Sequence, residues 1–152
     1  AYVANQLGEK LNVWGIVQDK SYASNVEKSF TPGTIEWKGF LETDKLQKEL
    51  GKCRALLNTP KWNEAYGNVI VEALACGVPV IGYRRGGPSE IIQHGETGFL
   101  VEPNDKDSLL SYLQIVNKIN RRDCRNWVEN NASTNIFASR VVKWLAKVIK
   151  EY

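Results

Sequence analysis

Residues 62–103 read WNEAYGNVIVEALACGVPVIGYRRGGPSEIIQHGETGFLVEP, and they hold the clearest structural pattern of the chain. Within them, Asn68–Cys76 is almost entirely apolar, which predicts a helix that is buried on most sides. Gly77 ends this helix and Pro79 follows shortly after, as is common beyond a helix C-terminus. The next run, Val78–Tyr83, is short and apolar, as buried strands are. This stretch therefore predicts a helix followed by a strand of an α/β sheet.

Working outward from this stretch, short apolar runs alternate with helical patterns. The predicted strands are Leu11–Val17, Thr34–Phe40, Arg54–Asn58, Val78–Tyr83 and Gly98–Val101. The predicted helices are Ala1–Leu7, Asp44–Leu50, Asn68–Cys76, Pro88–Gln93, Asp107–Asn117 and Ile136–Tyr152, while Ser21–Gly33 is expected to be a loop or a weak helix. Strands that alternate with helices favour an α/β fold with a parallel sheet and helices on both faces.

The composition of the 152 residues fits one globular domain, 1–152, because 43% are hydrophobic and 24% are charged. The net charge of +3 is too small and too dispersed to make a nucleic acid the expected partner. No apolar run reaches the roughly 20 residues that cross a bilayer. Cys53, Cys76 and Cys124 are odd in number and far apart, so we expect reduced thiols and a cytoplasmic protein.

Two carboxylates frame the start of the central helix. Glu64 lies in a polar stretch before it, and Glu72 lies about one turn into it, on the stripe of Asn68. The helix N-terminus between them presents free backbone N–H groups to a phosphate or a hydroxyl, and Gly67 allows a ligand close to the backbone. Carboxylates at the two ends could then accept hydrogen bonds from vicinal hydroxyls. In the alternative to a ligand site, Glu64 is an exposed acid in a loop, and Glu72 is half-buried and paired to an arginine.

The segment EAYGNVIVE resembles the E-x7-E motif of retaining, group-1 (family 4) glycosyltransferases, whose usual form is E-G-F-G-x-x-x-x-E-A-x-A-x-G-x-P-V-I. GGPSEII (Gly86–Ile92) and GETGFLVEP (Gly95–Pro103) follow in the order and spacing of that family. WKGFL (Trp37–Leu41) and the final helix also resemble it. The resemblance implies a GT-B fold, of which this chain would be the C-terminal, donor-binding half with a Rossmann-like, doubly wound parallel sheet.

The same resemblance implies a role for each matching residue. Glu64 would be the catalytic residue that holds the donor sugar hydroxyls near the reacting centre, and Glu72 would bind the ribose. The donor diphosphate and sugar would meet backbone N–H groups of Tyr66, Gly67, Asn68 and Val69. Leu41 would lie against the base. The partner would be a nucleotide-diphosphate sugar, with no metal and no other cofactor.

Two parts of the family pattern are missing from this sequence. The first strand, with its G-R…K-G signature, does not occur, and Ala1–Leu7 resembles the helix after it. In a sheet of order 3-2-1-4-5-6 that strand is central, so its loss should split the sheet. The N-terminal acceptor domain is also missing, which makes the chain a fragment that should transfer little alone. Arg84 and Arg85 could supply charge to the diphosphate or could be ordinary surface arginines, and His94 is expected to be an exposed turn residue.

The final helix, Ile136–Tyr152, carries apolar residues on one side and lysines and an arginine on the other. We expect a surface helix packed by one face, while a membrane-surface contact is the alternative for a basic amphipathic helix. These features lead to three hypotheses. One is the donor-binding domain of a hexosyltransferase, cytoplasmic and able to contact the inner membrane face. The alternative is a non-catalytic nucleotide-binding or docking module that needs a separate N-terminal subunit. The third is another GT-B enzyme, such as a sugar-nucleotide epimerase, over which the EAYGNVIVE and GGPSEII segments favour the transferase.

Overall fold

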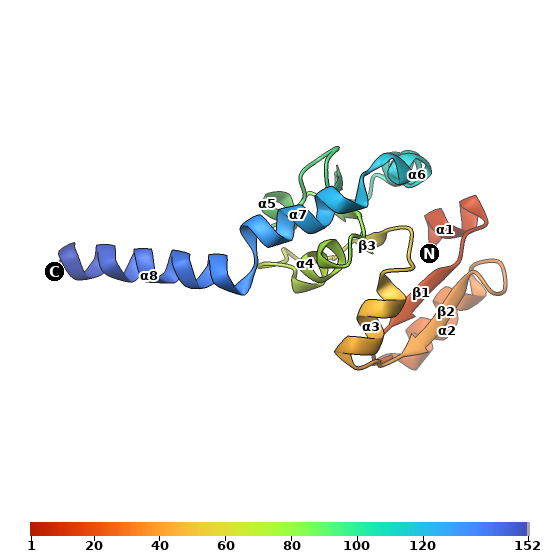
Figure 1. Ribbon diagram of the computed structural model, residues 1–152. Helices are drawn as coiled ribbons and strands as arrows, with labels where there is room; N and C mark the ends of the chain where they lie inside the picture. Colours follow the sequence, from red (N-terminus) through yellow and green to blue (C-terminus); the bar gives the residue numbers. More distant parts are fainter. Residues whose placement is uncertain (152) are drawn as a thin grey trace. The chain divides into compact units, whose positions relative to one another are not determined.

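Parallel strands form two separate sheets in the computed structural model, which describes residues 1–151 (Figure 1). One sheet belongs to a unit formed by Ala1–Leu46, and the other belongs to a unit that begins at Gln47. Each sheet is built by strands joined through helices, so both units have the parallel α/β architecture that the alternating pattern predicts. The predicted fold class is confirmed.

The first unit contains a two-stranded sheet. Its elements are α1 (Tyr2–Leu7), β1 (Leu11–Trp14), α2 (Lys20–Lys28), β2 (Ile35–Gly39) and the start of α3 (Thr43–Leu50). β1 and β2 run parallel, with Leu11 opposite Ile35. The Asn5 side chain ties α1 to the start of β2, because its Oδ1 accepts hydrogen bonds from Thr31 N–H (2.8 Å) and from the Thr34 hydroxyl (3.2 Å). Val3 and Ala4 of α1 are buried.

The second unit contains a three-stranded sheet of order β3-β4-β5. Its elements are β3 (Leu56–Asn58), α4 (Asn68–Ala75), β4 (Val80–Tyr83), α5 (Pro88–Ile91), β5 (Gly98–Val101), α6 (Lys106–Ile115), η1 (Val116–Lys118), α7 (Arg121–Asn131) and α8 (Thr134–Glu151). α4, α5 and α6 pack against this sheet, and α7 packs against α4. The core of the unit sits between α4 and the sheet, where Ile70, Leu74 and Ile81 are completely buried.

The strands form two separate sheets, as the expected split of the sheet predicts. Within the described residues, β1 pairs only with β2, and β3 pairs only with β4. β1 and β3 therefore each have one edge without a paired strand in this part of the chain.

Several predicted elements need correction. Ser21–Gly33 contains a regular helix, α2, whose start is capped by Asp19, which accepts a 2.8 Å hydrogen bond from Tyr22 N–H. α7 was not predicted at all, because only Cys124, Trp127 and Val128 break its polar sequence. The five predicted strands are all present, four of them with tighter bounds and β5 with the predicted bounds, and Gly77, with φ +68, ends α4 as predicted.

The final helix also differs from its prediction. Within the second unit, α8 runs on beyond α7 as one long helix (Figure 1). Its apolar side is largely exposed, since Phe137, Trp144 and Leu145 are 67%, 62% and 44% exposed. Tyr152, which the prediction included, lies outside the described residues. No helix in the described part of the chain has the length and apolar character needed to cross a membrane.

Candidate functional site

The candidate site is the loop between β3 and α4, together with the first turn of α4. The loop starts after Asn58, at the carboxyl end of β3, and ends at Gly67. In open parallel sheets, ligands bind outside the carboxyl ends of the strands. Six of the seven predicted site residues lie in this loop and helix, from Glu64 to Glu72.

The backbone of Glu64 is held by two glycines that follow β4. Glu64 and Gly86 form a parallel bridge, and Gly87 N–H donates a 2.7 Å hydrogen bond to the Glu64 carbonyl. Gly86 has φ +66, and a Cβ on it would collide with that same carbonyl oxygen. A Cβ on Gly87 would collide with the carbonyl of Tyr66. The GG pair is therefore required by the close approach of two backbones.

The side chain of Glu64 is half-buried and has one polar partner among the described residues. The indole Nε1–H of Trp62 donates a hydrogen bond of 3.1 Å to Glu64 Oε2. Trp62 itself is 65% exposed. The sequence did not indicate this tryptophan, because its contact with Glu64 depends on the conformation of the loop, which bends at residues 61 and 62.

The two arginines of the RRGG segment have different surroundings. Arg85 donates from Nη1 to the carbonyl oxygens of Lys61 (2.6 Å) and Pro60 (3.4 Å), so it anchors the start of the loop. Arg84 pairs with Glu102 at 3.0 Å, and both side chains are largely exposed. Neither arginine was predicted to support the loop, because the sequence does not show that these segments are neighbours.

The N-terminus of α4 begins at Gly67, which has φ +92 and caps the helix without a side chain. A Cβ at Gly67 would meet Ile70 Cδ1 at 3.0 Å and Glu64 Cγ at 3.6 Å. Tyr66, Asn68 and Val69 are exposed around this turn. The first N–H groups of a helix have no partner within it, so this turn can donate to an anion or a hydroxyl.

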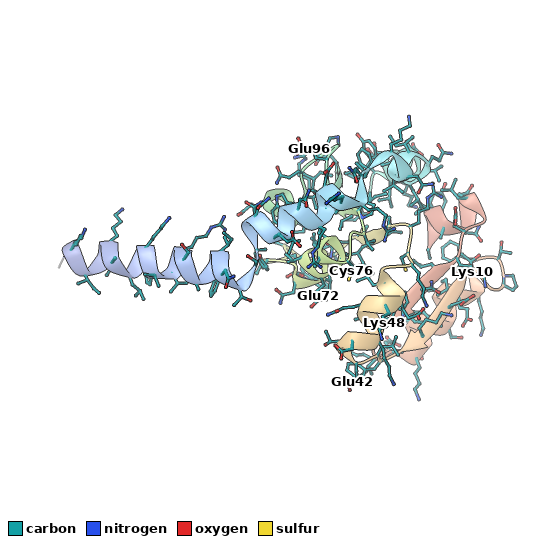
Figure 2. The ribbon with its side chains drawn as sticks, in the orientation of Figure 1. Lys10, Glu42, Lys48, Glu72, Cys76 and Glu96 are labelled. Atoms are coloured by element: carbon teal, nitrogen blue, oxygen red, sulfur yellow. The ribbon has the colours of Figure 1, made fainter. Side chains whose placement is uncertain are left out.

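Glu72 projects from α4 into solvent (Figure 2). Within the described residues, its carboxylate has no ion pair and accepts no hydrogen bond. The alternative of a half-buried Glu72 paired to an arginine is therefore wrong. One turn along the helix, burial raises the pKa of the Cys76 thiol, and the charge of Glu72 adds to that rise. Glu72 is thus available to a ligand that has hydroxyl or amine donors.

Leu41 lies in the first unit, half-exposed in the connection between β2 and α3. Its contact with a base stays a prediction. His94 is exposed in the turn before β5, as predicted, and its Nδ1 accepts a 3.1 Å hydrogen bond from Leu100 N–H. The ring edges of Phe99 and Tyr112 also contact it. His94 therefore stabilises the β5 turn.

The sequence contains one Asp-X-Asp triplet, Asp105–Asp107. Here Asp105 caps α6, because its side chain accepts hydrogen bonds from Ser108 N–H (3.0 Å) and the Ser108 hydroxyl (2.6 Å). These bonds lower the pKa of Asp105. The three cysteines are free thiols, as predicted. Burial raises the pKa of Cys124 to about 11.

Comparison with known proteins gives a family match over most of the chain. The model described as "Glycosyl transferases group 1" matches residues 9–134. A sucrose synthase of Acidithiobacillus caldus is 33% identical over 101 residues, which are 64% of this chain and 13% of that protein. The sulfoquinovosyl transferase SQD2 of Arabidopsis thaliana is 29% identical over 133 residues, which are 79% of this chain and 26% of that protein. The chain spans only a minor part of the length of either relative.

Solved structures share the fold. HepE of Anabaena in complex with UDP matches with a TM-score of 0.79 and 20% identity, over 91% of this chain and 41% of that one. The same protein in complex with UDP-glucose gives a TM-score of 0.77. At this level of identity the likeness shows the fold, which is the Rossmann-like α/β fold of the GT-B glycosyltransferases.

Proposed function

Because this chain belongs to the group 1 glycosyl transferases, we propose that it is the donor-binding domain of a retaining enzyme that moves a hexosyl group from a nucleotide-diphosphate sugar. The acceptor is a saccharide or a lipid-linked saccharide, bound by an N-terminal domain outside this chain. This domain alone transfers little or nothing. The observation that carries the proposal is the pair of carboxylates near the N-terminus of α4, with Glu64 in the loop before it and the exposed Glu72 one turn into it.

Each group at this turn has a role that its chemistry supports. The half-buried Glu64, fixed by Gly87 and Trp62, holds the sugar hydroxyls at the reacting centre. The exposed Glu72 accepts from the vicinal hydroxyls of the ribose. The diphosphate lies between them, over the backbone N–H groups of Tyr66–Val69. Leu41 lies against the base. No metal takes part in this proposal, and Asp105, in the one Asp-X-Asp triplet, is engaged as a helix cap.

A calorimetric titration of the full chain with UDP, GDP and ADP tests this function. Saturable binding of one nucleotide is expected, and it identifies the base. In Glu72→Ala the affinity should fall about tenfold or more, because charge-assisted hydrogen bonds to the ribose are lost. Glu96→Ala is the matched control, since Glu96 is an exposed glutamate in the turn before β5, away from α4 (Figure 2). Equal binding by Glu72→Ala and Glu96→Ala would contradict the proposed role of Glu72.

The second candidate function is a nucleotide-binding or docking module without catalysis. The unpaired edges of β1 and β3 favour it, because a strand from a separate subunit could pair with them. If the folded chain binds no nucleotide, this candidate gains support. Adding an upstream segment would then distinguish the two, since a donor domain should regain binding when its missing strand is supplied.

We also propose a cytoplasmic location with α8 lying on an anionic membrane surface. Along α8, Phe137, Val141, Trp144, Leu145 and Val148 form an apolar stripe at helical spacing. Arg140, Lys143, Lys147 and Lys150 lie on the other side. A basic face beside an aromatic and aliphatic face is typical of helices that lie in the membrane interface. The exposure of the apolar face and its positive surroundings together favour an anionic lipid surface as its occupant.

A further inference from the structure

We propose that Trp62 is a positioning residue, which holds the Glu64 carboxylate in the orientation that receives the donor sugar. This inference rests on the proposed function and adds a residue to it. The carrying observation is the 3.1 Å hydrogen bond from Trp62 Nε1–H to Glu64 Oε2. Trp62 is 65% exposed, so burial in the core does not explain an indole at this position.

The backbone on both sides of this pair is fixed. Before Trp62, the Lys61 carbonyl accepts a 2.6 Å hydrogen bond from Arg85. After it, the Glu64 carbonyl accepts from Gly87 N–H at 2.7 Å. Both anchors come from the segment that follows β4. Because the short stretch between them has little freedom, the indole and the carboxylate lose less conformational entropy when they form their hydrogen bond.

The chemistry of the indole suits this task. Its N–H is a donor only, so it orients the carboxylate without competing for the sugar hydroxyls that must donate to it. It is also uncharged, and a lysine or arginine at the same place would pair with the negative charge of Glu64. With one site of Oε2 occupied, Oε1 and the remaining lone pairs of Glu64 stay available for two vicinal hydroxyls.

The test compares the affinities of the full chain for UDP and for UDP-glucose. The ratio of the two dissociation constants isolates the contribution of the sugar, which is where Glu64 acts. In Trp62→Phe the ring stays and the N–H is lost, so we expect the sugar contribution to fall roughly threefold to tenfold while UDP affinity is unchanged. Trp144→Phe is the matched control, because Trp144 is a similarly exposed tryptophan on α8. The thermal midpoints of the variants should match that of the wild type.

The same measurement in a Glu64→Ala background makes the inference falsifiable. A residue that acts through Glu64 has no further effect once Glu64 is removed, so Trp62→Phe should then change nothing. A loss that persists in Glu64→Ala would overturn the inference in favour of direct contact between indole and ligand. Two results would overturn the inference and still support a donor domain through UDP binding. One is a sugar contribution in Trp62→Phe equal to that of the wild type. The other is a wild type in which the sugar adds nothing to the affinity. Failure of the wild type to bind either ligand would instead overturn the proposed function, and this inference with it.

Discussion

At the scale of single residues, the site depends on two glycines, because a side chain at either position would collide with the backbone of the loop. Gly86 has no side chain where the carbonyl of Glu64 lies, and Gly87 has none where the carbonyl of Tyr66 lies. These glycines allow the segment after β4 to support the loop after β3. The backbone of the glutamate that the motif identifies is thus held by residues about twenty positions further along the chain.

Gly86→Ala should destabilise the second unit and displace Glu64. Alanine would have to adopt φ +66, and its Cβ would collide with the Glu64 carbonyl. Gly95→Ala is a matched control, because Gly95 also has a positive φ, of +86, but has open space around it. We expect Gly86→Ala to lower the free energy of unfolding by at least about 2 kcal/mol more than Gly95→Ala does. Urea unfolding measures this difference, and equal losses in the two variants would contradict the proposed support.

At the scale of elements, the motif helix and the strands were readable because their patterns are strong. α4 is a short, nearly apolar helix, and Gly77 ends it. α7 was missed because it buries only Cys124 and Val128 fully, four residues apart, in an otherwise polar sequence. Its packing against α4 decides that it is a helix of the core. For Ser21–Gly33 the sequence predicts a loop or a weak helix, because Asp19, which caps α2, precedes a segment without a clear apolar period.

The first sheet has an acid-sensitive contact. Glu36 on β2 pairs with Lys10 at 2.6 Å, just before β1, and also with Lys38. The hydrogen bond from Lys10, followed by that from Lys38, lowers the pKa of Glu36 to about 2 from its ordinary value of 4.5. A carboxyl group whose folded pKa is lowered contributes stability above its unfolded pKa, and this contribution is lost as the pH falls through the folded value.

Glu36→Gln should therefore flatten the decline in stability of the first unit between about pH 4.5 and pH 2. Far-ultraviolet circular dichroism across this range, with urea unfolding at each pH, measures the decline. Glu42→Gln is the control, because Glu42 is an exposed glutamate outside both strands of the same unit (Figure 2). The difference should shrink at high salt, since the pair is exposed and screened. Parallel pH profiles of Glu36→Gln and the wild type would show that the pair contributes nothing.

At the scale of the whole molecule, the described chain consists of two α/β units with separate sheets and a long final helix. Within the described residues, β1 and β3 each have one edge without a paired strand. The final helix carries four basic residues and one acidic residue, Glu151, in its sequence. The positive charge and the exposed apolar face of this helix have no role in the proposed donor site.

The full chain should bind vesicles that contain phosphatidylglycerol more tightly than vesicles of phosphatidylcholine alone. Replacing Lys143 and Lys147 by Gln should weaken the binding to anionic vesicles roughly tenfold to thirtyfold, at about 1 kcal/mol for each lysine near the surface. Lys20 and Lys28, exposed on α2, provide the matched double replacement. Co-sedimentation at two salt concentrations measures the effect. Equal binding to both kinds of vesicle, or no binding to either, would contradict the membrane contact. The apolar face of α8 would then be expected to contact an acceptor domain.

The sequence by itself determined the α/β class, the five strands, the central helix and the two glutamates, because these depend on local pattern, on spacing and on a family motif. Two separate sheets were also predicted from it, because the signature of the family's first strand does not occur in these residues. Only the tertiary structure decided which residues hold Glu64 in place. Trp62 is close in sequence but needs a particular loop conformation, and Arg85, Gly86 and Gly87 reach the loop only because β3 and β4 are neighbours in the sheet. Such contacts depend on the packing of distant segments, and no local pattern in the sequence carries that information.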